Sequence, residues 1–578
     1  MVGAGSIDCC RDRNLLFKSQ NRNWSTNSTI NSASSSSHPL NLPPPLHIAR
    51  HQFPYSPSPS SPKQYLMASW ETFPPELQIL VWQALIDAHG RQDGPATGLT
   101  SYACVSKSWQ YYFEQKTFRS FTLDKSHFLQ FIAITTSKRR RTLVKHVLLQ
   151  FLVHPSFEGP ETGIYSYSDH LDVECFHTVA MLLRILSSWD VWSEGDGLTL
   201  ELGACTSIEA TQLGIYHRRA KLFSKFLEGS PASECNYPPY VFDDKGLGID
   251  CAGFQNPPAE REALALWNKA KRKRLGVKSL NIGSSAFISG SPRIVTKLLI
   301  RLEYFPNFDP RTIAKILQQL PRVQHFHLER WQFGRMESDR QWNVQSYEVL
   351  KDLGTHMKTL TIFEESDTDF HRQSRFPPPT RYCPKLLRLL FISCQHLEHL
   401  AFSYFVDAPD AFLVLATRLY MSGGLMLWSP RLPEPPELSL KSLALTASKL
   451  TSASASDVAP ILRSAAEAAT RMPCLQTLEL WNHDKGEMAI FRYHRTEETS
   501  EIVWQSTQDM ELGSSSMSAW KRVVAWHSKS RHELKATVTR FPEKAKASYD
   551  VLQHLQLKEL VIHDMSAHQL EKEFMRVE

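Results

Sequence analysis

The sequence predicts an α/β protein in which helix–strand units follow a short helical segment. From residue 277 onward, the six-residue pattern aliphatic-x-x-apolar-x-apolar recurs, and helical stretches precede several of its copies. A repeated helix–strand unit gives parallel strands joined by right-handed crossovers. Near the amino end, residues 71–123 instead show two apolar stretches with helical spacing. The 578 residues are enough for several domains or one extended array.

Composition and charge exclude several classes of function. The chain is 42% hydrophobic and 21% charged, with a net charge of +6. Because the basic residues are scattered, we expect no nucleic-acid partner. No run approaches the roughly 18 apolar residues of a membrane span, so we expect no membrane partner. The ten cysteines lack zinc-binding spacing, and we expect reduced thiols in the cytoplasm or nucleus.

Residues 1–66 are rich in Ser, Pro and Asn, as in SSSSHPLNLPPPLH and SPSPSSPK. Such a composition cannot bury enough apolar surface to offset the entropy of ordering, so it predicts a disordered tail. The segment lacks the apolar centre of a secretory signal. Because it is basic, Ser-rich and poor in acidic residues, a mitochondrial transit peptide is the minor alternative.

The first ordered element is expected at residues 71–123. Apolar residues recur there with helical spacing, at Leu77, Leu80, Val81, Ala84 and Leu85. Pro74 and Pro75 suit the first turn of that helix, and a second helix is expected from Leu99 to Phe113. Two short helices that are apolar nearly all round cannot bury those residues in each other. The segment therefore needs the rest of the chain or a partner.

The same stretch resembles an F-box. Its first half reads Phe73-Pro74-Pro75-Glu76-Leu77, where that family has apolar, Pro, any residue, Glu and aliphatic. Its second half, residues 102–109, reads YACVSKSW, where the family has Leu-x-x-Val-Cys-Lys-x-Trp. Phe73 replaces the usual Leu, Ser106 replaces the usual Cys, and the loop at residues 87–98 is longer than in most members.

The resemblance implies that residues 71–123 bind a Skp-family adaptor and, through it, cullin and RING subunits. By motif match, the adaptor-binding residues are Phe73, Pro74, Pro75, Glu76, Leu77, Leu80, Leu85, Val105 and Trp109. The alternative is an ordinary helical hairpin that caps a larger domain.

The repeated pattern predicts the architecture of residues 140–578. Its copies begin at Val144, Val277, Val323, Met357, Leu397, Leu440, Leu475 and Leu557. Helices are expected at 309–320, 344–353, 384–393 and 457–470. The units resemble the irregular leucine-rich repeats that follow F-boxes in many ubiquitin-ligase receptors, which implies a helix–strand solenoid. A nonrepetitive α/β domain with Leu-rich strands is the alternative.

Two insertions are expected to interrupt this array, at residues 203–276 and 485–535. The second contains two strand-like runs, 489–495 and 501–507, which predict a β-hairpin. An amphipathic helix with Trp520 and Val523 on one side is expected after it. This layout looks like that of F-box proteins that are numerous in filamentous fungi.

The strand pattern also predicts a client-binding surface. Because side chains alternate along a strand, the residues between the apolar positions should share one concave face. The candidate client-binding residues on that face are His325, His327, Phe363, His399, Glu479 and Trp481. Aromatic residues dominate interface energies, so Phe363 and Trp481 are expected to contribute most. The alternative is that neighbouring loops cover both rings.

The sequence contains no phosphate-binding, dinucleotide-binding or nucleophile motif, so we expect no catalytic residues, no metal site and no cofactor. The favoured function is the substrate-recognition subunit of a Skp–cullin–F-box (SCF) ubiquitin ligase, with an unidentified protein client. An F-box scaffold that ubiquitinates nothing is the first alternative. An enzyme of unknown chemistry, with its active site in residues 203–276, is the second.

Overall fold

The computed structural model describes residues 70–90, 101–190, 197–206, 279–281, 290–365, 395–428 and 437–574, with short gaps, and two short strands between 241 and 249. The expected disordered tail and most of the expected 203–276 insertion lie outside the described residues. The chain divides into two units, Met1–Pro74 and Pro75–Glu578. In the first unit, a 3-10 turn spans Trp70–Thr72, and the rings of Trp70 and Phe73 stack with centroids 5.9 Å apart.

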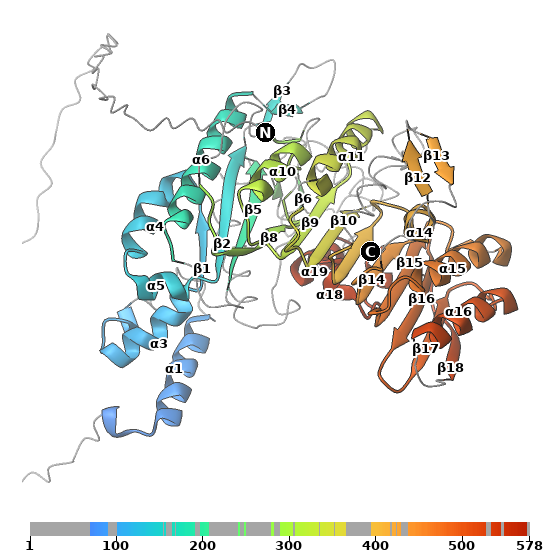
Figure 1. Cartoon of the computed structure of the whole chain (residues 1–578). Helices are drawn as coiled ribbons and strands as arrows, with labels where there is room; N and C mark the ends of the chain where they lie inside the picture. Colours follow the sequence, from blue (N-terminus) through green and yellow to red (C-terminus); the bar gives the residue numbers. More distant parts are fainter. Residues whose placement is uncertain are drawn as a thin grey trace, which may run out of the picture. The chain divides into compact units, whose positions relative to one another are not determined.

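The second unit is built on one 12-stranded sheet (Figure 1). In spatial order its strands are β1 (Ser120–Leu123), β2 (His146–Val153), β5 (Leu198–Thr206), β8 (Val295–Ile300), β9 (His325–Trp331), β10 (Thr359–Glu365), β11 (His399–Ser403), β14 (Ser442–Thr446), β15 (Thr477–Asp484), β16 (Glu487–Arg495), β17 (Ser500–Ser506) and β18 (Leu534–Arg540). Neighbouring strands are parallel from β1 to β15. This confirms the expected α/β class.

The parallel series ends at a tight turn between β15 and β16. The two turn residues, Lys485 and Gly486, have φ angles of 51° and 83°. Positive φ at both central residues is the hairpin geometry that matches the right-handed twist of the strands, and glycine adopts it without steric cost. β16 therefore runs antiparallel to both β15 and β17, and β18 pairs parallel to β17 at the sheet edge.

Helices between the strands cover one face of the sheet. They are α6 (Asp169–Ser187), α10 (Pro310–Gln318), α11 (Met336–Lys351), α14 (Ala408–Ala416), α15 (Ala455–Ala469) and α16 (Ser514–His527). In α10, Asp309 caps the amino end, Pro310 occupies the first turn, and Ile313 and Ile316 are buried. These helices pack on alternate strand residues such as Leu360, Leu443 and Leu478 and form the larger core.

The remaining helices lie before and after this core. The amino-terminal ones are α1 (Pro75–Gly90), α3 (Lys107–Thr117), α4 (Phe128–Ile134) and α5 (Lys138–Leu143), with a 3-10 turn at Lys125–His127. The carboxy-terminal ones are α17 (Ser548–Leu552), α18 (Lys558–Val561) and α19 (Asp564–Phe574). Residues of this carboxy-terminal part, including Val551, Leu555 and Leu570, form a second core with the strand residues that face away from the crossover helices.

Six copies of the six-residue pattern lead into sheet strands, namely those beginning at residues 144, 323, 357, 397, 440 and 475. Two copies do not. Leu280 forms an isolated bridge with Phe308, and the sheet strand is the apolar run β8 further along the chain. The copy at Leu557 forms α18, where Leu557, Leu560 and Val561, spaced i, i+3 and i+4, can share one face of a helical turn.

Other expected boundaries differ in the structure. The expected Leu99–Phe113 helix is broken, and α3 begins at Lys107 because the Ser106 side chain accepts a hydrogen bond from the Trp109 amide. Residues 485–535 contain the expected hairpin and helix, but their strands extend the sheet beside β15. The expected helix at 384–393 lies outside the described residues.

Leu445→Ala tests the larger core. Leu445 is fully buried between β14 and the helical layer, so its truncation should lower the free energy of unfolding by about 2–5 kcal/mol. Leu129, which is 82% exposed on α4, is the matched control, and its change to Ala should cost at most about 0.5 kcal/mol. Urea denaturation measures both, and equal losses would contradict this packing.

Candidate functional site

The strand residues expected to point outward do share one face of the sheet, but the carboxy-terminal segment, residues 548–574, packs on it. α18 contacts β10 and β11, and α17 contacts β15 and β16. Phe363 and Trp481 are 1% and 0% exposed within this second core. The expected open concave surface is therefore closed over these aromatic residues. The covering residues belong to short helices, one of which was expected to be the last strand.

Glu479, on β15, binds the start of the covering segment. Its side chain is fully buried, and its two oxygens accept hydrogen bonds from the amides of Gln556 at 2.9 Å and Leu557 at 2.7 Å. Arg492 on β16 donates to the same carboxylate at 2.6 Å and also to the carbonyl of His554 at 2.7 Å. Burying a carboxylate is costly unless donors replace water. Here the donors come from the segment itself and from the neighbouring strand.

Glu329, on β9, binds the other end of α18. It accepts hydrogen bonds from the amide of His563 at 2.6 Å and the amide of Leu302 at 2.8 Å. His327 donates to it through Nε2 at 2.7 Å. Between the two glutamates, the Thr361 hydroxyl donates to the carbonyl of Leu560 at 2.8 Å. Four strand side chains therefore fix the backbone of residues 554–563 on this face.

A third buried carboxylate, Glu201 on β5, lies further along the same sheet. His146 binds it through Nε2 at 2.8 Å, and the guanidinium of Arg301 binds it at 2.6 Å. Burial alone would raise the pKa of Glu201, but the charge of Arg301 and the hydrogen bond from His146 hold that pKa below its usual value. Glu201 is therefore an ionised, internally neutralised group.

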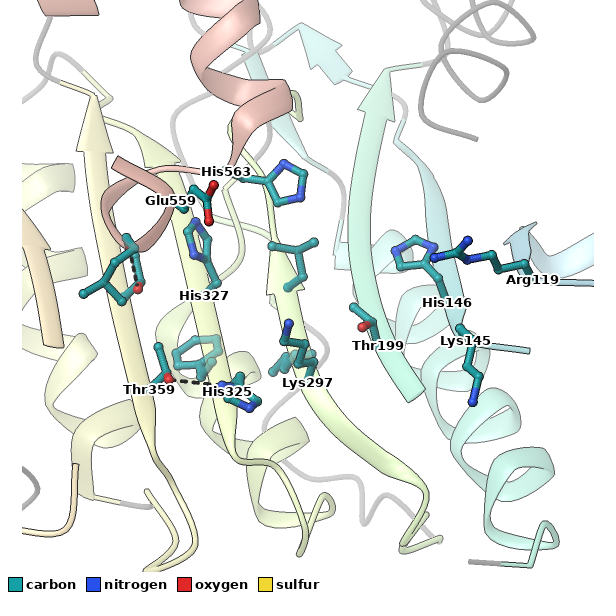
Figure 2. A pocket seen from close by; sticks show the side chains of 15 residues that line it. Arg119, Lys145, His146, Thr199, Lys297, His325, His327, Thr359, Glu559 and His563 are labelled. Atoms are coloured by element: carbon teal, nitrogen blue, oxygen red, sulfur yellow. Dashed lines mark hydrogen bonds between the residues drawn. The ribbon is translucent and has the colours of Figure 1, made fainter. Parts of the chain in front are cut away.

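Beside α18, this face has a cavity of about 390 Å³ (Figure 2). The cavity lies at the amino ends of β2, β5, β8, β9 and β10. Its charged and imidazole-bearing lining residues are Arg119, Lys145, Lys297, Glu559, His146, His325, His327 and His563. These residues include three basic side chains and one carboxylate. Figure 2 shows Glu559 beside His327 and His563, and Lys297 near His325.

The pKa of His325 reflects its burial and the positive charges around this cavity. Burial, followed by the charges of Lys297 and Lys358, lowers the pKa of His325 to about 4. The ring nitrogen Nδ1 lies 3.0 Å from the Thr359 hydroxyl. At neutral pH His325 is therefore an uncharged polar group. His563 behaves in the same direction, because burial and the nearby Arg301 lower its pKa well below the usual value.

The candidate client-binding residues thus have three different environments. His325 and His327 line the cavity. Phe363, Trp481 and Glu479 are buried under or bound to the carboxy-terminal segment. His399 is half-buried at the start of β11 and does not line the cavity. Glu329, Arg119 and Lys297 were not among the residues expected from the sequence. For Glu329 and Lys297 the available signal was a charged residue at an outward position of a strand, whereas Arg119 precedes β1 and carried no such signal.

The expected adaptor-binding residues lie on a different part of the chain. In the first unit, Phe73 and Pro74 are exposed. In the second unit, Leu77 and Leu80 are 45% and 63% exposed on α1, beside exposed Pro75 and Glu76, whereas Leu85 is half-buried. Val105 is also exposed. Ile79 and Val81, which were not among the expected contacts, add to the exposed apolar residues of α1.

Trp109 has a different environment. Its ring lies within the packing of α1 and α3, with centroids 6.2 Å from Trp82 and 5.7 Å from Phe113. Tyr112 completes the contact at 4.6 Å from Trp82. Such aromatic pairs stabilise packing by about 0.5–1.5 kcal/mol each beyond their buried area. Trp109 therefore holds the two helices together.

A buried ion cluster joins these helices to the sheet. Glu114 on α3 is 3% exposed and binds Arg139, and it accepts from Arg140 Nη2 at 2.8 Å. Burial would raise the pKa of Glu114, but hydrogen bonds from Gln110 and both arginines hold it below its usual value. The basic run at residues 138–141 thus contributes two arginines to a structural contact.

Comparison with known proteins adds one finding. Residues 352–563 match a family of unknown function, DUF6546. The matched part runs from β10 to the end of α18 and includes Glu479 together with the amides that it binds. No curated protein and no solved structure matches the chain. Within the described residues, no helix is long and apolar enough to span a membrane, and no group of His, Cys, Asp or Glu is arranged to hold a metal ion.

Glu479→Ala should release the carboxy-terminal segment. The change removes the acceptor of two amides and leaves Arg492 without its carboxylate, so the free energy of unfolding should fall by about 3–5 kcal/mol. Limited proteolysis within residues 545–563 should become faster. The control is Glu398→Ala, which removes a partly exposed carboxylate paired with Lys441 and should cost about 0–1 kcal/mol. Unchanged proteolysis in Glu479→Ala would show that this carboxylate does not hold the segment.

Stability should fall as the pH decreases from 6.5 towards 4. In this range the unfolded chain protonates His325 and the folded chain does not, because the folded-state pKa is the lower one. His325 therefore gives its full contribution above pH 6.5 and loses it at lower pH. Denaturant unfolding of His325→Gln should show a shallower pH dependence than the unchanged chain. Identical slopes for the two proteins would contradict the burial of a neutral imidazole.

Proposed function

We propose that the chain is the substrate-recognition subunit of an SCF ubiquitin ligase. In this function, the F-box-like residues 71–123 bind a Skp-family adaptor, and the sheet domain presents a protein client. The observation that carries the proposal is the exposed apolar surface of α1, formed by Leu77, Ile79, Leu80 and Val81. Exposed apolar patches of this kind mark interaction sites.

The energetics favour a partner for α1. Burying a leucine or isoleucine side chain is worth about 1.5–3 kcal/mol relative to leaving it in water. Four apolar residues within positions 77–81 would have little reason to stay apolar on a permanently solvated helix. Leu77 is the last residue of the stretch 73–77 that resembles the first half of the F-box signature. The second half, residues 102–109, leads into α3.

The packing of α1 supports presentation of this surface to a partner. Trp82 is the buried residue of α1, and it packs against Trp109 and Tyr112. The opposite residues of the helix are left exposed. An ion pair between Glu114 and Arg140 links α3 to α5. A helix held from one side by aromatic packing presents a preformed surface, which reduces the entropy lost on binding.

The sheet domain is proposed to be the client-presenting part. Its parallel strands and crossover helices are similar in arrangement to an irregular leucine-rich-repeat solenoid, in which each unit closes the apolar face of the last. A receptor of this kind needs no catalytic group. It would raise the effective concentration of client lysines near a ubiquitin-conjugating enzyme brought by the cullin and RING subunits, in the cytoplasm or nucleus.

The buried state of Phe363 and Trp481 favours a second candidate. Because the carboxy-terminal segment occupies their face of the sheet, no extended concave surface is open there for a client. An F-box scaffold that binds the adaptor and ubiquitinates nothing would need no such surface. Cullin co-purification and client accumulation under proteasome inhibition separate the two functions, since the scaffold predicts neither.

Leu77→Ala combined with Leu80→Ala tests adaptor binding. Both side chains are exposed, so the double variant should fold like the unchanged chain. If each leucine contributes about 2 kcal/mol at an interface, the affinity for a Skp-family adaptor should fall by several hundredfold, or about 4 kcal/mol. Val344→Ala, at an exposed apolar residue on α11, is the control and should bind fully. Undiminished co-purification of the adaptor with the folded double variant would reject the F-box assignment.

A further inference from the structure

The outer side of β18 is an open edge of the large sheet. β18 is the last strand in the spatial order, and no described strand pairs with its other side (Figure 1). Six of its seven residues, all except Leu534, are exposed. At the opposite end of the sheet, β1 has four residues, of which Thr122 alone is exposed. A short or covered edge strand resists pairing with another chain, whereas a long exposed one is a template for it.

The register with β17 determines which backbone groups lie at this edge. Phe541 donates its amide to the carbonyl of Ser506 at 3.0 Å, and successive residues of a strand direct their amides to opposite sides. Thr537 therefore bonds to β17, whereas the N–H and C=O groups of Ala536 and Val538 point outwards. The pairing with β17 runs through seven consecutive residues without a bulge. β18 thus presents a regular row of donors and acceptors.

The side chains that usually protect an edge do not protect this one. Proline is absent from β18. Arg540 Nε donates to the carbonyl of Thr507 at 3.2 Å, which turns the guanidinium back onto the sheet. Lys535 lies directly opposite Glu501 of β17, where the two opposite charges attract each other. Val538, which is 52% exposed, leaves an apolar side chain uncovered at the edge.

We propose that two copies of this chain pair through β18, antiparallel about a two-fold axis at Thr537, so that their sheets become continuous. This register brings all seven residues of each strand into the pair. Thr537 faces its own counterpart, and Ala536 faces the partner's Val538, so that this apolar pair occurs twice. The outward N–H and C=O groups of Ala536 and Val538 then bond across the junction. Cross-strand pairs of threonines and of apolar side chains stabilise such a sheet.

Charge and layering favour a second copy in this orientation. In the antiparallel register, Lys535 faces the partner's Thr539 and Arg540 faces the partner's Leu534, so no like charges are opposed. A parallel pair in register would oppose each lysine to its counterpart. The two-fold axis stands perpendicular to the sheet, so the crossover helices of both copies, including α16, cover the same face. The interface is then the same surface on both chains, as in most two-fold dimers.

Sedimentation velocity of the full chain tests the pairing. The chain should sediment as a dimer at about 50 μM and dissociate on dilution. Val538→Pro removes an outward amide that makes no bond to β17, and an edge strand accepts proline at such a position. This variant should therefore fold, which circular dichroism verifies, and sediment as a monomer. Val538→Thr keeps the amide, so it is the matched control and should remain a dimer.

Thr537→Cys tests the register. In the proposed dimer Thr537 lies about 4.5 Å, Cα to Cα, from its counterpart, within reach of a disulfide. The oxidised Thr537→Cys variant should form a cross-linked dimer that a reductant separates, and adding Val538→Pro should abolish the cross-link. Lys535→Cys is the control, because the two copies of that position would lie about 14 Å apart, too far for a disulfide.

Three results would overturn the proposal. The first is a monomeric full chain at about 50 μM, which would leave the edge to a strand of a different protein. The second is equal dimerisation of the Val538→Pro and Val538→Thr variants. The third is cross-linking of Lys535→Cys to the same extent as Thr537→Cys. Adaptor co-purification depends on α1 and should be unchanged in Val538→Pro, so failure of this interface and failure of the F-box assignment are distinguishable.

Discussion

The arrangement of this protein depends on the satisfaction of two buried carboxylates. Glu329 and Glu479 stand at outward positions of β9 and β15, where the strand amides are already used in the sheet. A carboxylate deprived of water needs other donors, or its burial costs several kcal/mol. The donors are the amides of Gln556, Leu557 and His563. The carboxy-terminal segment and the sheet face therefore stabilise each other, and the apolar contacts of Phe363 and Trp481 follow from that pairing.

Closing this face determines which surfaces remain for partners. The apolar residues of α1 stay exposed because the aromatic side chains of α3 pack on the side of α1 that carries Trp82. The cavity lies beside α18 and is lined by the amino ends of β8 and β9. One surface is formed by apolar side chains, and the other is lined largely by basic and imidazole side chains.

Local sequence patterns predicted the elements better than they predicted their surroundings. The strands containing Leu360, Leu443 and Leu478 were predictable, because alternation of apolar residues is a property of the strand itself. The copy at Leu557 failed because Val561 adds an apolar residue at i+4, so that Leu557, Leu560 and Val561 also fit one face of a helical turn. The burial of Trp481 could not be predicted, since the covering residues follow it by some 70 positions and its own neighbours do not encode them. The cavity was missed for the same reason, because Arg119, Lys145 and Lys297 are brought together only by the order of the strands.

Hydrogen–deuterium exchange of the full chain tests most directly whether the carboxy-terminal segment closes the sheet face. The informative amides are those of Gln556, Leu557 and His563, which donate to the buried carboxylates. If the face is closed as described, these amides exchange as slowly as those in the neighbouring strand β15, because both are freed only when the sheet face opens. Exchange at the rate of an unstructured peptide, with β15 still protected, would contradict the closed face and leave Phe363 and Trp481 open to a client.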